Sequence, residues 1–125
     1  MIIGIGTDII EVARIRASYE RFGERFVSRI LLSSETQYCL SHKDPAPFLA
    51  ARFAAKEAVS KAFGTGIGGS LGWLDIEVRR KASGEPFVEL HGKGADLLKA
   101  RNGRALHLTL SHTTEHATAT AVLEA

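Results

Sequence analysis

The stretch Arg52–Gly69, RFAAKEAVSKAFGTGIGG, constrains the fold more than any other part of this chain. It predicts a helix built on alanines and a few large apolar residues, which runs directly into a glycine-rich loop. Residues four positions apart lie on the same face of a helix, so Phe53, Glu57 and Lys61 share one stripe. A carboxylate among several cations, followed by a loop rich in backbone N–H groups, favours a metal-bridged phosphate ligand over a solvated surface.

The periodicity of apolar residues predicts an α+β fold with a small, largely antiparallel sheet packed on a long central helix. The expected elements are a strand at 1–10, a helix at 11–22, a second helical segment after Gly23, a short helix near 34, the central helix from 45 to about 63, strands at 73–79 and 87–90, a helix at 94–102, and strands at 106–110 and 116–123. The 125 residues fit a single domain, 1–125, with one core.

Small residues predict where two backbones approach closely. Gly4 and Gly6 lie between isoleucines in the first strand, so this strand is expected to pack tightly against another backbone. Ala117, Ala119 and Ala121 lie on one face of the last strand. Such a thin face can be covered by a helix at close range, or an oligomer can complete it.

Local signals predict how the elements end and which residues face the core. Phe22 is expected inward on the first helix, and Leu74 inward on the strand at 73–79. Asp44 is expected to cap the central helix, and Gly64 to end it in the left-handed conformation.

The composition is that of an ordinary soluble globular protein, and the net charge of +2 is too small to indicate a nucleic-acid binder. The single cysteine, Cys39, cannot form an internal disulfide, which favours the reducing cytoplasm. A secretory signal is not expected, because the first residues contain neither a basic segment nor a long apolar one, and no apolar run approaches the length needed to span a membrane.

Asp8, expected near the end of the first strand, and Glu57 on the central helix are candidate ligands for a hard cation such as Mg²⁺. This ion prefers one or two protein carboxylates together with phosphate and water oxygens. Spacing alone favours a simpler alternative, in which Asp8 caps the following helix and Glu57 pairs with Lys61.

Arg52, Lys56 and Lys61 are candidates for binding phosphate, with a solvated helix face as the alternative. The following loop, Gly64–Gly69, matches the pattern G-x-G-x-x-G. A dinucleotide fingerprint must follow a strand and open a helix, whereas this loop follows a helix, so we reject that interpretation. The loop can still offer N–H groups to an anion, or it is a flexible turn.

No activated nucleophile is evident in the sequence. Ser111 and His112 are adjacent in a strand and point to opposite faces, so they cannot act as a pair. His112 is either a ligand-binding group at a strand end or a plain turn residue. His107 and His116 lack the spacing of a zinc site.

A basic stripe lies opposite the apolar face of the first helical region, formed by Arg14, Arg21, Arg25 and Arg29 with Ser18. It is either a solvated face or an electrostatic docking surface for an acidic partner. Stacking aromatic residues are not interleaved with these arginines, which argues against nucleic acid.

Together these motifs closely resemble the holo-[acyl-carrier-protein] synthases, which are short bacterial 4'-phosphopantetheinyl transferases. The resemblance runs nearly end to end and rests on GIGTDI at 4–9, RFAAKEA at 52–58 with KAFGTGIG at 61–68, and SHT at 111–113. It implies transfer of the 4'-phosphopantetheine arm of coenzyme A to a serine of apo acyl carrier protein, with release of adenosine 3',5'-bisphosphate. The attacking serine belongs to the partner, and the modified carrier serves fatty acid synthesis.

The resemblance also implies roles for individual residues. Asp8 and Glu57 would hold Mg²⁺ against the pyrophosphate, and Lys61 would bind the phosphates and steady the leaving group. Arg52 and His112 would contact the 3'-phosphate end of coenzyme A. The pocket would be shaped by the loop residues Gly64, Thr65, Gly66 and Gly68, and the acidic carrier would dock on Arg14, Arg21 and Arg25.

Other matters stay open at this point. The group that takes the serine proton is Glu57 or a metal-held water, and we favour the water because a metal-bound carboxylate is a poor base. The resemblance implies a homotrimer with active sites between subunits. The alternative functions are a basic polyanion-binding module and a Mg²⁺-dependent phosphohydrolase acting on coenzyme A.

Overall fold

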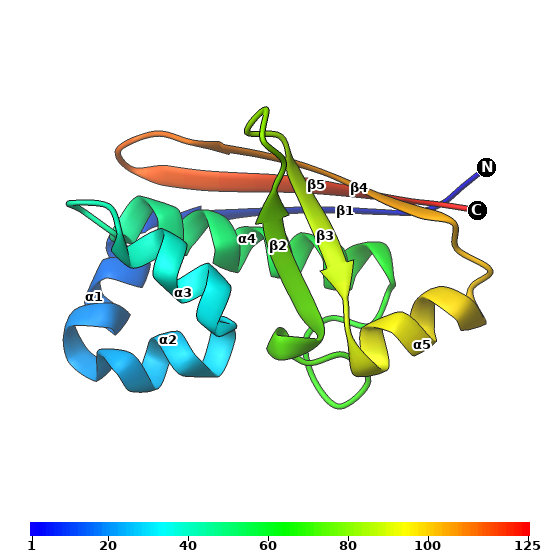
Figure 1. Ribbon diagram of the computed structural model, residues 1–125, viewed down its shortest axis with the longest axis horizontal. Coiled ribbons are helices and arrows are strands. Elements are labelled where there is room, and N and C mark those ends of the chain that lie inside the picture. Colours follow the sequence, from blue (N-terminus) through cyan, green and yellow to red (C-terminus); the bar gives the residue numbers. More distant parts are fainter.

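A computed structural model describes all residues, 1–125, and confirms the predicted α+β fold (Figure 1). In chain order the elements are β1 (Ile2–Glu11), α1 (Val12–Phe22), α2 (Glu24–Ile30), α3 (Ser33–Leu40), α4 (Ala46–Ala62), the 3₁₀ turn η1 (Trp73–Asp75), β2 (Ile76–Arg80), β3 (Pro86–Leu90), α5 (Gly92–Ala100), β4 (Ala105–His112) and β5 (His116–Glu124). Strands β1, β5 and β4 form a three-stranded antiparallel sheet in that order, and β2 and β3 form a separate hairpin.

The long helix α4 lies along one face of the three-stranded sheet (Figure 1). The alanines of β5 are buried beneath it, at no more than 1% exposure. A side chain on Gly6 would overlap the carbonyl oxygen of Ala58, and one on Gly4 that of Ala62. The predicted close approach of backbones is therefore confirmed, and the partner of the first strand is α4.

The other side of α4 is covered by α1, α3 and the β2–β3 hairpin, so this helix is buried on nearly all faces (Figure 1). Two charged residues predicted to face a ligand, Arg52 and Lys56, are 2% and 0% exposed. Gly23 has a φ of 54° between α1 and α2, and Gly64 has a φ of 78° after α4. Both breaks occur where the sequence predicts them.

Five local predictions were wrong. Phe22 and Leu74 are each 44% exposed instead of facing the core, and residues 73–75 form η1 rather than strand. Asp44 does not cap α4, because both of its carboxylate oxygens accept hydrogen bonds from the Arg16 guanidinium. Asp8 lies inside β1, which continues to Glu11.

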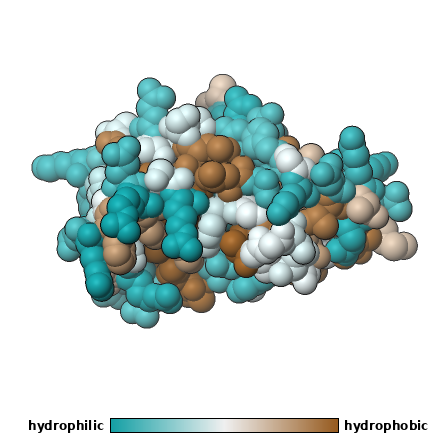
Figure 2. All heavy atoms as spheres, turned by 90° about the horizontal axis from the view of Figure 1, so that it is seen from below, coloured by the Kyte–Doolittle hydropathy of each residue, from teal (hydrophilic) through white to brown (hydrophobic).

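The face seen from below in Figure 1 carries α2 and α5, and Figure 2 shows its surface. Hydrophobic side chains there form separate patches between hydrophilic ones. No helix is long and apolar enough to cross a membrane.

Candidate functional site

Three predicted site residues meet where β1 crosses α4. The Lys61 ammonium donates hydrogen bonds to Asp8 Oδ1 and to the carbonyl oxygen of Thr7, both at 3.0 Å. The missing side chains at Gly4 and Gly6 let β1 lie directly on α4, and this contact brings Asp8 to Lys61. The simpler alternative, in which Asp8 caps the following helix and Glu57 pairs with Lys61, was wrong. Lys61 pairs with Asp8, and α1 has no side-chain cap.

Glu57 lies one turn before Lys61 on the same helix, and the Asp8 carboxylate repels its negative charge. Partial burial raises the pKa of Glu57, repulsion from the Asp8 carboxylate raises it further, and Lys61 opposes the change. A cation beside the two carboxylates would offset the burial and repulsion that disfavour the ionised form of Glu57. Their hard oxygen atoms fit Mg²⁺.

The glycine loop does not offer the predicted row of free N–H groups. The N–H groups of Gly64, Thr65, Gly66 and Gly68 all donate to backbone carbonyls within the chain. Gly66 has a φ of 66°, and a side chain on Gly68 would meet only open space. These residues thus fix the path of the loop and leave room above it.

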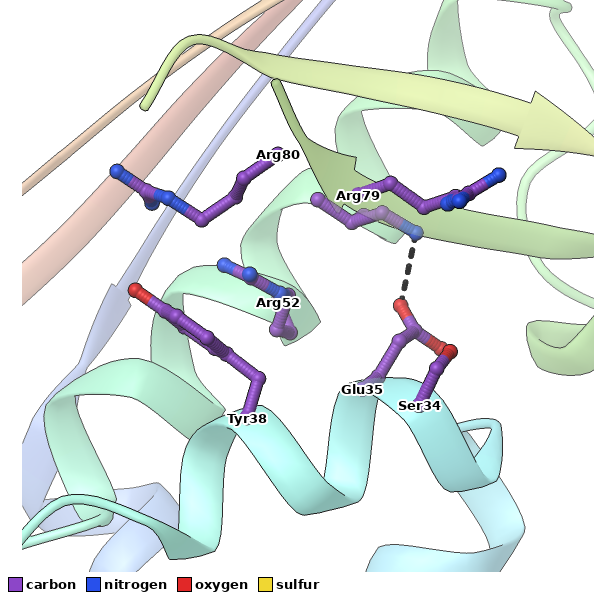
Figure 3. Close-up of a pocket in the computed structure, with 7 residues that line it drawn as sticks. Ser34, Glu35, Tyr38, Arg52, Arg79 and Arg80 are labelled. Carbon is purple, nitrogen blue, oxygen red and sulfur yellow. Dashed lines mark hydrogen bonds between the residues drawn. The ribbon is translucent and has the colours of Figure 1, made fainter. Parts of the chain in front are cut away.

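Arg52 and His112 line a second region, a groove of about 300 Å³ that also contains Tyr38, Phe48 and Arg80. Asp8, Glu57 and Lys61 do not line this groove. Tyr38 and Arg80 were missed by sequence reasoning, because α3 and β2 reach Arg52 only in the folded chain. The groove continues past Tyr38 to Ser34 and Glu35 (Figure 3).

Lys56 is not available to a phosphate. Its ammonium donates to the carbonyl oxygens of Ile30 at 2.6 Å and Trp73 at 3.0 Å, and to Glu35 at 2.7 Å. All three donor positions are therefore used within the core. The prediction that Lys56 binds phosphate was wrong, and its role is structural.

The basic stripe is exposed as predicted: Arg14, Arg21, Arg25 and Arg29 all lie at the surface of α1 and α2. Phe22 stands among them, with Arg21 and Arg25 placed 5.0 and 6.0 Å from its ring centroid. An aromatic ring surrounded by arginines combines apolar area with positive charge. That combination suits an acidic protein partner.

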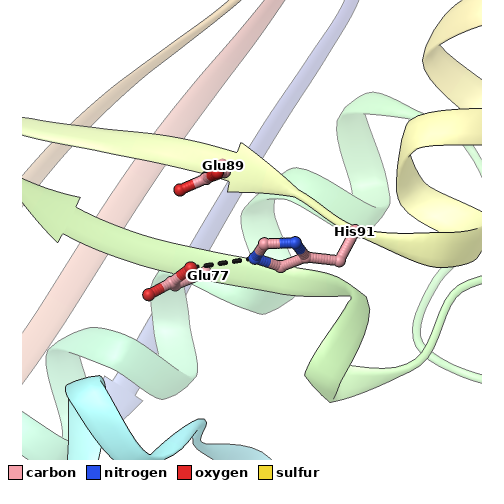
Figure 4. A group of neighbouring side chains, drawn as sticks. All are labelled: Glu77, Glu89 and His91. Carbon is pink, nitrogen blue, oxygen red and sulfur yellow. Dashed lines mark hydrogen bonds and ion pairs between the residues drawn. The ribbon is translucent and has the colours of Figure 1, made fainter.

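A second acidic cluster, Glu77, Glu89 and His91, lies on the β2–β3 hairpin (Figure 4). His91 Nε2 is 2.8 Å from Glu77 Oε1, and Arg79 donates to Glu89 at 2.7 Å. Side chains of the chain already donate hydrogen bonds to both carboxylates here, whereas the Glu57 carboxylate accepts none. The pair Asp8 and Glu57 is therefore the better metal candidate.

The sequence and fold match known proteins over nearly their whole length. The model of the 4'-phosphopantetheinyl transferase superfamily matches residues 4–121. The holo-[acyl-carrier-protein] synthase of Koribacter versatilis is 48% identical over 124 residues, which cover 99% of each chain.

Two crystal structures extend this similarity to the fold. The holo-[acyl-carrier-protein] synthase of Neisseria meningitidis is 35% identical with a TM-score of 0.93 over 100% of both chains. The enzyme of Bacillus anthracis, in complex with coenzyme A (3',5'-ADP), is 42% identical with a TM-score of 0.83 over 100% of this chain and 98% of its own. The chain therefore belongs to the 4'-phosphopantetheinyl transferase superfamily, and within it to the holo-[acyl-carrier-protein] synthases.

Proposed function

We propose that the whole domain, residues 1–125, transfers the 4'-phosphopantetheine arm of coenzyme A to a serine of apo acyl carrier protein in the cytoplasm, with Mg²⁺ as its metal. The product is the active carrier for fatty acid synthesis, and adenosine 3',5'-bisphosphate is released. The observation that carries this proposal is the meeting of Asp8, Glu57 and Lys61 where β1 crosses α4. The single, buried cysteine fits a reducing compartment.

Asp8 and Glu57 are the residues that would hold Mg²⁺. A divalent cation held there would neutralise pyrophosphate charge that otherwise repels an incoming nucleophile. Asp8 is only 16% exposed, so its carboxylate is partly shielded from water, and its attraction to a cation is correspondingly stronger.

Lys61 supplies the second positive charge. Its side chain is 49% exposed and is held by only two oxygen atoms, those of Asp8 and Thr7. The third N–H of the ammonium is free to donate to a phosphate oxygen. We propose that Lys61 binds the phosphates and steadies the charge on the leaving group.

We find no catalytic nucleophile in the chain, and we therefore propose that the serine of the carrier attacks. Ser111 and His112 are adjacent on β4 and point to opposite faces of the sheet, so they do not form a catalytic pair. We propose that the carrier docks on Arg14, Arg21 and Arg25 with Phe22 at their centre, and that docking aligns its serine with the phosphorus atom.

The active form is proposed to be a homotrimer with sites between subunits. The sheet face opposite α4 is covered by no helix (Figure 1). Ile5 and Ile9 are 63% and 68% exposed on it, beside Thr118 and Val122 of β5. The metal residues and the groove at Arg52 are separate regions of one chain. An extended ligand that reaches both fits a site completed by a neighbour.

The decisive experiment incubates the protein with apo acyl carrier protein, coenzyme A and Mg²⁺, and weighs the carrier by mass spectrometry. We expect the carrier serine to gain the mass of one phosphopantetheine, and no gain would contradict the proposal. Asp8→Ala and Glu57→Ala should abolish the gain while the circular dichroism spectrum stays unchanged. Coenzyme A breakdown without a carrier would instead indicate a phosphohydrolase, and carrier-independent polyanion binding without Mg²⁺ a binding module.

A further inference from the structure

Asp8 and Glu57 come from different elements, so the distance between their carboxylates depends on how β1 is held beside α4. β1 is an edge strand, because the order of the sheet is β1-β5-β4. It therefore pairs only with β5, where Ala119 is the register partner of Asp8. The contacts between the two strands at this register position help to decide where the Asp8 carboxylate lies.

Two threonine hydroxyls join β1 and β5 at this register position. Thr118 Oγ1 donates to the backbone carbonyl oxygen of Asp8 at 3.0 Å, and Thr7 Oγ1 donates to that of Ala119 at 3.1 Å. Each carbonyl of the pair thus accepts a hydrogen bond from a side chain of the opposite strand. Among the register pairs of these strands, this is the one in which side chains bind both carbonyls.

The carbonyl that Thr118 binds is one of the two that flank the Cα atom of Asp8. The other belongs to Thr7, and it accepts a hydrogen bond from the Lys61 ammonium at 3.0 Å. Because peptide groups are planar, two fixed carbonyls leave little freedom in the φ and ψ angles of Asp8. They therefore set the direction in which its side chain leaves the strand.

This direction matters because the Asp8 carboxylate acts on a second negative group. Partial burial and the charge of Asp8 raise the pKa of Glu57, so the two carboxylates repel each other. Repulsion of this kind pushes a loosely held strand away from α4. Mg²⁺ requires near-ideal octahedral geometry, so a small displacement of one ligand oxygen weakens its binding.

We propose that Thr118 is a positioning residue, whose hydroxyl holds the Asp8 backbone so that the Asp8 carboxylate can meet a divalent cation together with Glu57. Its neighbours Ala117 and Ala119 are buried beneath α4, so the Thr118 side chain lies on the opposite face of the sheet and acts through β1. This inference rests on the proposed function, in which Asp8 and Glu57 hold the metal.

Thr120 provides a matched control for Thr118. Both threonines lie on the same face of β5, and both are half-buried. The Thr120 hydroxyl contacts the Thr7 hydroxyl at 3.5 Å and forms no hydrogen bond with Asp8. Thr118→Val and Thr120→Val each replace one hydroxyl with a methyl group of similar size, so effects on the sheet or on assembly should be shared.

The first test measures the transfer rate as a function of Mg²⁺ concentration. The concentration that gives half of the maximal rate should rise about 10-fold in Thr118→Val, whereas the rate at saturating Mg²⁺ should stay close to that of the unchanged protein. Thr118→Ser keeps the hydroxyl and should restore the ordinary Mg²⁺ requirement. A merely structural role would lower stability or the saturated rate without this shift. Equal Mg²⁺ requirements in Thr118→Val and Thr120→Val would overturn the inference and leave the proposed function intact.

Binding of Mn²⁺, a paramagnetic substitute for Mg²⁺, separates this inference from the proposed reaction. Mn²⁺ is titrated into each variant with coenzyme A and without carrier, and electron paramagnetic resonance measures the free ion. Binding should be about 10-fold weaker in Thr118→Val and unchanged in Thr120→Val. If this difference is found but the unchanged protein modifies no carrier, the reaction is wrong and the positioning role stands. If transfer occurs but both valine variants bind Mn²⁺ alike, the positioning role is wrong.

Discussion

Lys56 and Glu35 form an ion pair from which water is wholly excluded: Nζ lies 2.7 Å from Oε1, and neither side chain has any exposed surface. Glu35 also accepts hydrogen bonds from the backbone N–H groups of Leu32 and Val78. The pair thus ties α3 and α4 to the middle of β2. Burial lowers the pKa of Lys56, and the adjacent Glu35 carboxylate opposes that change.

Replacing Lys56 should destabilise the fold strongly. Lys56→Met keeps the length of the side chain but leaves the Glu35 carboxylate buried without its cation. Breaking a buried pair in this way costs about 3–5 kcal/mol. Urea unfolding followed by circular dichroism measures the free energy of unfolding.

Lys61→Met is the control for that substitution, because it removes the same charge from the same helix at a half-exposed position. It should cost about 1 kcal/mol or less in stability, yet it should remove most of the transfer activity. Similar losses of stability in the two variants would show that the pair with Glu35 contributes little.

Lys56 and Lys61 show which contacts of α4 can be predicted from the sequence and which cannot. Helical spacing placed Glu57 and Lys61 on one stripe, and the glycines of β1 predicted the close backbone contact that brings Asp8 to them. The sequence could not place the elements that cover the opposite side of α4. Whether Lys56 meets solvent or Glu35 depends on how α3 packs, and no local pattern records that.

Gly6 should not tolerate even a methyl group. A side chain there would overlap the Ala58 carbonyl oxygen, so β1 would have to move away from α4. We expect Gly6→Ala to cost about 1–3 kcal/mol or more and to reduce Mg²⁺-dependent transfer, since Asp8 moves with β1. Gly69→Ala meets open space and should keep stability within about 0.5 kcal/mol. Thermal unfolding and a transfer assay on both variants test this difference.

Glu57→Gln should separate stability from activity. Partial burial and the nearby Asp8 both disfavour the ionised Glu57, as its raised pKa records. At neutral pH in the presence of a chelator, the variant should therefore unfold at a higher temperature than the unchanged protein. Its transfer rate should fall at least about 100-fold, because a metal-holding oxygen is lost. A lower unfolding temperature in the chelator would contradict the repulsion between Asp8 and Glu57.

Cys39 should be inert in the folded protein. It is fully buried, and this burial raises the pKa of its thiol to about 11. The unfolded thiol ionises at a lower pH, so the unfolded state loses its proton first and stability should fall as the pH rises from about 9 to about 11. Alkylation at pH 8, followed by mass spectrometry, should label Cys39 only in urea. Rapid labelling without urea would contradict its burial.

Reversing a charge on α1 should weaken carrier docking without affecting the chemistry. Arg14 is exposed on α1, at the opposite end of the molecule from the loop that contains Arg104 (Figure 1). Arg14→Glu should raise the apparent KM for the acidic carrier about 10-fold at low salt and leave the KM for coenzyme A unchanged. Because salt screens charges over about 10 Å at 0.1 M, the difference should shrink at high ionic strength. Arg104→Glu makes the same change in net charge, so equal effects of the two variants would show a response to overall charge instead of a docking surface on α1.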